Sequence, residues 1–91
     1  MAAAIRDNTE QHRFELDAEG GTAVMVYHLE PGVITLLHTE VPHALEGKGI
    51  GSAIVRGVLD LVRARGLEVV VKCPFVAAYM KRHPEYDDLL A

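Results

Sequence analysis

The stretch Glu46-Gly47-Lys48-Gly49-Ile50-Gly51-Ser52 places three glycines at alternate positions, directly before a long helical pattern. Because glycine has no Cβ, the backbone here turns sharply and leaves room for a ligand to approach closely. A helix that begins after such a turn has unpaired N–H groups in its first turn and directs the positive end of its dipole at the turn. These properties form an anion site, and phosphate is the usual biological anion. The stretch therefore predicts a cradle for the pyrophosphate of a cofactor.

The helix that we predict after the glycines runs from about Gly49 to Arg65. Gly57 lies near its middle, at a cost of about 1 kcal/mol relative to alanine, so we expect a neighbour to pack closely there. Gly66 is a natural C-terminal cap. Apolar residues cover most of the helix, which predicts that it lies across a sheet. The polar stripe is narrow and consists of Ser52, Arg56, Asp60 and Arg63.

Three runs before the glycines predict strands. The run His12–Asp17 alternates apolar and polar residues, and the runs Thr22–Leu29 and Val33–Val41 are β-branched and aliphatic. Tight turns at Glu19-Gly20-Gly21 and Glu30-Pro31-Gly32 separate them, since these residues suit the dihedral angles of hairpin turns. We therefore expect a three-stranded antiparallel meander.

After the helix, Leu67–Lys72 contains three consecutive valines and predicts a buried fourth strand. A strand–helix–strand connection of this length usually places its two strands in parallel, so the fourth strand should pair with Val33–Val41. Phe75–His83 predicts a short helix that Pro84 ends, and Tyr86–Ala91 predicts a short tail. The expected fold is α+β (α/β): the meander, the glycine-initiated helix, the parallel fourth strand and a short C-terminal helix.

Composition restricts the class of protein. The chain has 91 residues, of which 49% are apolar, so we expect one domain over residues 1–91, with residues 1–11 frayed. The net charge of -4 argues against broad nucleic-acid binding. Without a signal peptide or an apolar span, and with Cys73 as the single cysteine, the chain is expected in the cytoplasm, away from membranes and as a monomer. The five histidines show no metal-ligand spacing, so we expect no metal.

Three motifs in this order resemble the GNAT superfamily of acyl-CoA-dependent N-acetyltransferases, and most of all its short single-domain Yjdj-type branch. The resemblance covers the chain from about Phe14 to Tyr86. Its motifs are His38-Thr39-Glu40-Val41-Pro42, Glu46-Gly47-Lys48-Gly49-Ile50-Gly51, and Cys73-Pro74-Phe75-Val76 with His83-Pro84-Glu85-Tyr86.

The resemblance implies that the chain binds acetyl-CoA. The family signature is Gln or Arg, two residues, Gly, one residue, and Gly or Ala. Gly49 and Gly51 match its small positions, but Glu46 stands where the family has Gln or Arg, and Lys48 is placed to supply the missing positive charge. The strand before the loop is expected to pair with the pantetheine arm through its backbone. The implied cofactor-binding residues are Thr39, Val41, Glu46, Gly47, Lys48, Gly49, Ile50, Gly51 and Ser52.

The implied reaction is acetyl transfer to an amine, and three residues are candidates for its chemistry. Cys73 stands beside the expected thioester as a nucleophile near a helix N-terminus, or is a small buried apolar residue. His38 is placed to deprotonate the amine, or forms a structural hydrogen bond. Tyr79, with Lys81, is similar to the Tyr-x-Lys pattern whose tyrosine donates to the leaving sulfur, or it packs the short helix.

Other classes of protein fit less well. A P-loop is excluded because no Gly-Lys-Ser/Thr follows a four-residue spacer, and a Rossmann domain does not begin with antiparallel strands. The main alternative is a non-catalytic acyl-CoA-binding module, because the chain lacks the N-terminal helices that commonly wall the acceptor site in larger family members. A purely structural domain ranks third. The acidic first half, with seven acidic and two basic residues before residue 46, would attract a cationic amine, small or on a protein.

Overall fold

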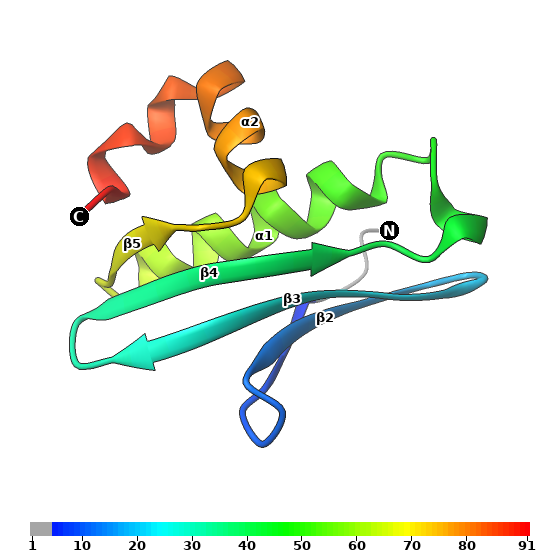
Figure 1. The fold of residues 1–91 in the computed structure, drawn as a ribbon, viewed down its shortest axis with the longest axis horizontal. Coiled ribbons are helices and arrows are strands. Elements are labelled where there is room, and N and C mark those ends of the chain that lie inside the picture. Colours follow the sequence, from blue (N-terminus) through cyan, green and yellow to red (C-terminus); the bar gives the residue numbers. More distant parts are fainter. Residues whose placement is uncertain (1–4) are drawn as a thin grey trace.

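The computed structural model describes residues 5–91, which form one mixed sheet with helices packed against it (Figure 1). The strands are β1 (Ile5–Asn8), β2 (Arg13–Ala18), β3 (Gly21–Glu30), β4 (Val33–Glu40) and β5 (Glu68–Val71). The helices are α1 (Ile50–Ala64) and α2 (Pro74–Arg82), with 3₁₀ turns η1 (His43–Leu45) and η2 (Pro84–Leu89).

The sheet has five strands in the order β1-β2-β3-β4-β5, where four were predicted. The antiparallel meander over β2, β3 and β4 is confirmed, and so is the parallel pairing of β4 with β5. The detailed strand arrangement differs from the prediction because β1 adds a fourth antiparallel strand at the edge, paired with β2.

Strand β1 corrects the prediction that residues 1–11 fray, of which residues 1–4 lie outside the described part of the chain. β1 has little apolar patterning and is held by tertiary contacts instead. The Asp7 carboxylate accepts a hydrogen bond of 2.5 Å from the Tyr27 hydroxyl and pairs with Arg65 at 2.8 Å. Ile5 packs on Gly57 so closely that a Cβ at Gly57 would lie 2.7 Å from Cγ1 of Ile5. The predicted close neighbour of Gly57 is therefore β1.

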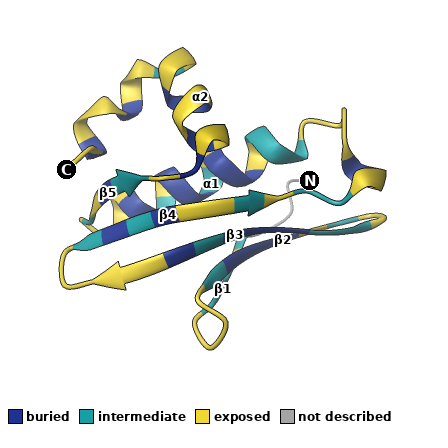
Figure 2. Ribbon diagram, in the orientation of Figure 1, coloured by how far each residue is buried: buried dark blue, intermediate teal, exposed yellow. Residues whose placement is uncertain are grey.

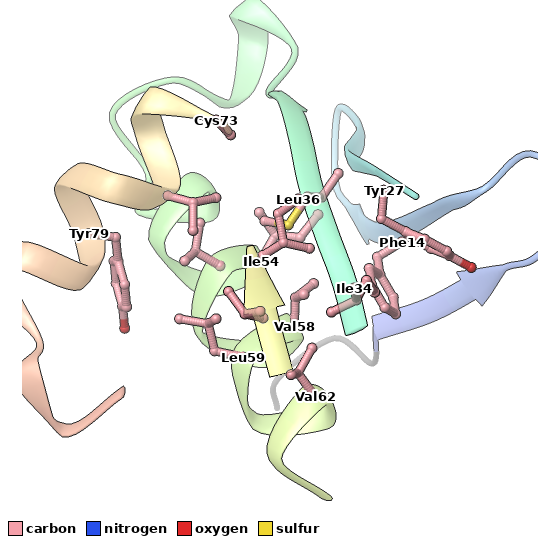
Figure 3. Packing of buried hydrophobic residues seen from close by; sticks show 14 of the residues in the cluster. Phe14, Tyr27, Ile34, Leu36, Ile54, Val58, Leu59, Val62, Cys73 and Tyr79 are labelled. Atoms are coloured by element: carbon pink, nitrogen blue, oxygen red, sulfur yellow. The ribbon is translucent and has the colours of Figure 1, made fainter. Parts of the chain in front are cut away.

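Helix α1 runs behind the sheet in Figure 1 and buries one apolar face against it. Figure 3 shows Ile54, Val58 and Val62 of α1 on the side of the sheet residues Phe14, Ile34 and Leu36, and Leu59 on the side of α2. All of these side chains are fully or almost fully buried (Figure 2). Each buried side chain of this size contributes about 1.5–3 kcal/mol through the hydrophobic effect, so this layer holds the fold together.

The C-terminal segment is more ordered than the predicted tail. Helix α2 begins with Pro74 in its first turn and packs against β4 and β5. The 3₁₀ turn η2 follows, and its Tyr86 hydroxyl donates to the Asp60 carboxylate at 2.7 Å. Arg63 pairs with Asp88 at 2.7 Å, so α1 is tied to the C-terminal segment from its polar stripe. Among residues 5–91, no helix is long and apolar enough to cross a membrane.

Candidate functional site

The glycine turn adopts the geometry that the sequence predicts. Gly47 and Gly49 have positive φ angles of 77° and 75°, which a side chain would strain. Gly49 is the N-cap of α1, and the N–H of Ala53 donates to the Gly49 carbonyl at 3.0 Å. The N–H groups of Ile50, Gly51 and Ser52 precede this first helical bond, so they face the turn as donors for an anion. The N–H of Lys48 instead donates to the Leu45 carbonyl at 3.4 Å.

A pocket of about 250 Å³ lies at this turn. It brings together most of the predicted cofactor-binding residues, whereas Thr39 and Lys48 are not part of its wall. Leu45 and Phe75, which are not among the predicted cofactor-binding residues, complete the pocket. Its lining is Val41, Leu45, Glu46, Gly47, Gly49, Ile50, Gly51, Ser52 and Phe75. Backbone donors at one end and apolar side chains around them suit a ligand that carries a phosphate group on an apolar arm.

Glu46 lines the pocket, as its position in the motif implies, and its carboxylate has a partner. Oε2 of Glu46 lies 3.2 Å from Nδ1 of His43, three residues earlier in the 3₁₀ turn η1. Both side chains are exposed. This contact directs the carboxylate of Glu46 toward His43.

Strands β4 and β5 separate beside the pocket. Their pairing runs from Val33 and Glu68 to Leu36 and Val71, after which the N–H groups of Lys72 and Cys73 both donate to the Leu36 carbonyl. The register between β3 and β4 shifts at the same level, because Tyr27 pairs with Leu36 and Val26 with His38. Leu37 is therefore the extra residue of a β-bulge, a feature that bends a strand and often lies beside active sites. Beyond it, β4 pairs with β3 alone.

Cys73 lies where the two strands part. It is the N-cap residue of α2, and only 3% of it is exposed. Its sulfur lies 3.3 Å from the Thr39 hydroxyl across the gap between the strands. Burial raises the pKa of the Cys73 thiol, but the Thr39 hydroxyl and the backbone N–H groups of Val76, Phe75 and Thr39 outweigh burial and lower the pKa below its ordinary value of 9.0. These interactions favour the thiolate of Cys73, although the residue is almost completely buried.

The other two candidates for chemistry lie apart from this thiol. His38 is exposed, with Nε2 3.0 Å from Oε2 of Glu40, and it follows the bulge on β4. Since neighbouring residues of a strand point to opposite faces, His38 faces away from Thr39 and its contact with Cys73. Tyr79 is buried and stacks on His83 with ring centroids 4.0 Å apart. Figure 3 shows Tyr79 farther along α2, with its hydroxyl directed away from Cys73.

The sequence contains a signal for one of the two site features that were not predicted, Phe75, and none for the other, the β-bulge at Leu37. Phe75 is an aromatic residue two positions after the candidate thiol, in the first turn of the predicted helix, so its place beside the site could have been found. Nothing in the sequence marks the bulge at Leu37. Within residues 5–91, the structure contains no group of three or more His, Cys, Asp or Glu side chains that could hold a metal ion.

Known proteins with the same architecture identify the family. Residues 13–89 match the sequence model described as GCN5-related N-acetyl-transferase. The chain is similar to Protein NATD1 of Mus musculus (28% identity, over 88% of the chain and 76% of that protein) and of Homo sapiens (33%, over 68% and 56%). Its fold is similar to the solution structure of a GCN5-like protein from Staphylococcus aureus, with a TM-score of 0.73 at 22% identity over 98% of this chain and 88% of that one. The family model covers most of the chain, and the fold is a single α+β unit with a glycine-initiated helix. The chain therefore belongs to the GCN5-related N-acetyltransferase family.

Proposed function

We propose that the chain binds acetyl-CoA and transfers its acetyl group to an amine. The observation that carries the proposal is the separation of β4 from β5 beside the glycine turn. The separated edge offers backbone groups to an extended arm, the pocket at Gly47–Ser52 offers donors to its phosphates, and Cys73 lies where the arm would end. A phosphate site next to an open strand edge suits coenzyme A, which carries phosphates and an extended arm, better than a mononucleotide, which lacks that arm.

Acetyl-CoA supplies the acetyl group as a thioester. In direct transfer, the amine nitrogen forms a bond with the carbonyl carbon, the carbon–sulfur bond breaks, and its electron pair leaves with sulfur as a thiolate that takes up a proton. His38 is proposed to accept the proton that the amine loses, because it is an exposed imidazole that follows the bulge on the separated strand. An amine is expected to approach from that face.

A second route passes through Cys73. Its thiolate would form the bond with the carbonyl carbon, while the carbon–sulfur bond to coenzyme A breaks and coenzyme A leaves as a thiolate. The amine nitrogen would then bond to the same carbon, the Cys73 sulfur would leave as a thiolate, and the proton that the amine loses would balance the one that coenzyme A takes up. The lowered pKa of Cys73 and its place at the start of α2 favour this route. The role of Tyr79 as donor to the leaving sulfur stays a prediction from the resemblance. However, Tyr79 lies six residues after Cys73, about 9 Å along α2 by helical rise, and this separation favours a packing role for its ring.

The test is mass spectrometry of the protein incubated with acetyl-CoA and a panel of amines: a polyamine, a small metabolite amine, a peptide with a free N-terminus and a lysine peptide. Acetylated amine above the uncatalysed background supports the enzyme. Acetyl retained on Cys73, and lost in Cys73→Ala, identifies the second route. The variant Thr35→Val, in the part of β4 that still pairs with β5, is the control for nonspecific loss of activity.

A melting experiment separates the enzyme from the binding module. Acetyl-CoA at a hundredfold excess over its dissociation constant should stabilise the fold by about 2.7 kcal/mol. Stabilisation without acetylated product from any amine would support the non-catalytic acyl-CoA-binding module. A melting temperature that millimolar acetyl-CoA leaves unchanged would contradict both the enzyme and the binding module.

A further inference from the structure

The ring of Phe75 lies against the backbone of Gly51. A Cβ added at Gly51 would lie 2.6 Å from Cζ of Phe75 and 3.1 Å from its Cε2, closer than real contacts allow. Gly51 is the second residue of α1, with no left-handed φ that would require glycine. The space above Gly51 is therefore occupied by an aromatic ring from the first turn of α2, and the absence of a side chain makes room for that ring.

Phe75 is also unusual in its exposure. It is 43% exposed, although it belongs to a helix that buries Val76, Tyr79 and Met80. The exposed part of the ring lines the pocket at the glycine turn, together with Val41 and Ile50. A half-exposed aromatic ring in a pocket wall offers an apolar surface that a ligand can cover.

The position of Phe75 along the site shows which part of a ligand it would meet. On one side it contacts Gly51, where α1 offers its N–H groups to an anion. On the other side it follows Cys73 by two residues, at the point where β4 and β5 separate. A ligand that reaches from the glycine turn to the thiol passes this ring with the segment between its phosphates and its thioester.

We infer that Phe75 is a positioning residue whose ring packs against the pantetheine arm of the cofactor, and that Gly51 is small in order to seat this ring. The inference rests on the proposed binding of acetyl-CoA and adds to it a residue and a reason for Gly51. Close approach of a phosphate would be the other reason for a glycine at this position. The two reasons predict different behaviour when Gly51 and Phe75 are changed together.

The experiment measures the dissociation constant of coenzyme A by titration calorimetry for Phe75→Ala, Phe75→Leu, Gly51→Ala and the double variant. We expect Phe75→Ala to weaken binding about tenfold, because the apolar wall is lost, and Phe75→Leu to weaken it less. Leu29→Ala removes an exposed apolar side chain from the end of β3, outside the pocket, and should bind as the unchanged chain does.

The double variant tests the role of Gly51. Gly51→Ala should displace the ring and weaken binding in the unchanged chain, yet have no further effect when Phe75 is already alanine. If Gly51→Ala weakens binding equally in both backgrounds, the glycine serves the phosphate and the seating of the ring is refuted. If Phe75→Ala binds as tightly as the unchanged chain, the contact with the arm is refuted.

A failure of the proposed function would give a different result from a failure of the role of Phe75. In that case the unchanged chain itself shows no heat of binding with coenzyme A, which rejects the cofactor and, with it, the role of Phe75 toward it. Melting curves accompany each variant. Because the ring is half exposed, Phe75→Ala and Phe75→Leu should remain folded, so a change in affinity reports on the pocket.

Discussion

The hydroxyl of Thr39 lies 3.3 Å from the sulfur of Cys73, and this contact bridges two strands at the point where they stop pairing. Thr39 belongs to β4, and Cys73 follows β5 and caps α2. The thiol is thus held by an oxygen from one strand and by N–H groups from the helix that begins beside it. Both interactions stabilise the thiolate, although burial opposes them.

The first prediction concerns Thr39→Val, which keeps the shape of the side chain and removes the hydroxyl. Folding lowers the pKa of the Cys73 thiol, so below pH 9.0 the folded chain holds more thiolate than an ordinary cysteine would. Loss of the hydroxyl raises this pKa, and alkylation of Cys73 should become slower near neutral pH. The rate of alkylation by a small reagent against pH, followed by mass spectrometry, measures the shift. Since Cys73 is the single cysteine, the signal has one source.

Thr35→Val is the control for this measurement, because Thr35 lies on the same strand and pairs with Val70 rather than contacting the thiol. Its alkylation profile should match that of the unchanged chain. A profile of Thr39→Val that also matches would show that the hydroxyl has no influence on the thiolate.

The second prediction concerns Glu46, the carboxylate at the rim of the pocket. Glu46→Gln removes a negative charge that faces the proposed pyrophosphate and keeps the size of the side chain. Because both Glu46 and His43 are exposed, the effect is screened, and we expect coenzyme A to bind about two- to fivefold more tightly. Titration calorimetry at low and high salt measures it. The gain should shrink at high salt, and Glu30→Gln at the far end of β3 should show none.

The third prediction concerns the Tyr79 hydroxyl. The ring stacks on His83, and the hydroxyl points away from Cys73, so Tyr79→Phe should keep the acetyl-transfer rate and the melting temperature close to those of the unchanged chain (Figure 3). Steady-state rates with the best amine of the panel provide the measurement. A fall in kcat of tenfold or more, with an unchanged melting temperature, would instead establish the hydroxyl as the donor to the leaving sulfur.

The fourth prediction concerns the contact between α1 and β1. Gly57→Ala should destabilise the fold by about 1–3 kcal/mol, because the added methyl group meets Ile5 in a space that is already full. In an Ile5→Ala background the same change should stabilise the fold by up to about 1 kcal/mol, since alanine favours the helix. Urea unfolding of the four chains gives the coupling. Equal effects of Gly57→Ala in both backgrounds would show that β1 does not pack there.

Local pattern was sufficient for the elements that carry a regular apolar face. The amphipathic period identifies α1, the paired glycines identify the hairpin between β2 and β3, and the triple valine identifies β5. Strand β1 could not be predicted, because its position depends on Asp7, which binds Tyr27 and Arg65 from distant parts of the chain. A local sequence pattern does not indicate which distant residues will come into contact when the chain folds.

The same distinction holds for the candidate site, where some features follow from the local sequence and others depend on tertiary contacts. Backbone geometry at Gly47 and Gly49 follows from the residues themselves, since glycine alone adopts such angles without strain. The reason for Gly51 does not, because it depends on a phenylalanine 24 positions later that reaches the same spot from another helix. The bulge at Leu37 depends on the register between β3 and β4, which tertiary pairing decides.

The separated end of β4 has a cost for the protein in solution. A strand with one unpaired edge is a template on which another molecule can add a strand, and such edges promote aggregation. Here the bulge at Leu37 bends the edge, and the exposed charge of Glu40 follows it, two devices that discourage pairing between copies. An edge protected in this way disfavours pairing between copies, while its backbone groups stay accessible to the narrow, flexible arm of the proposed cofactor.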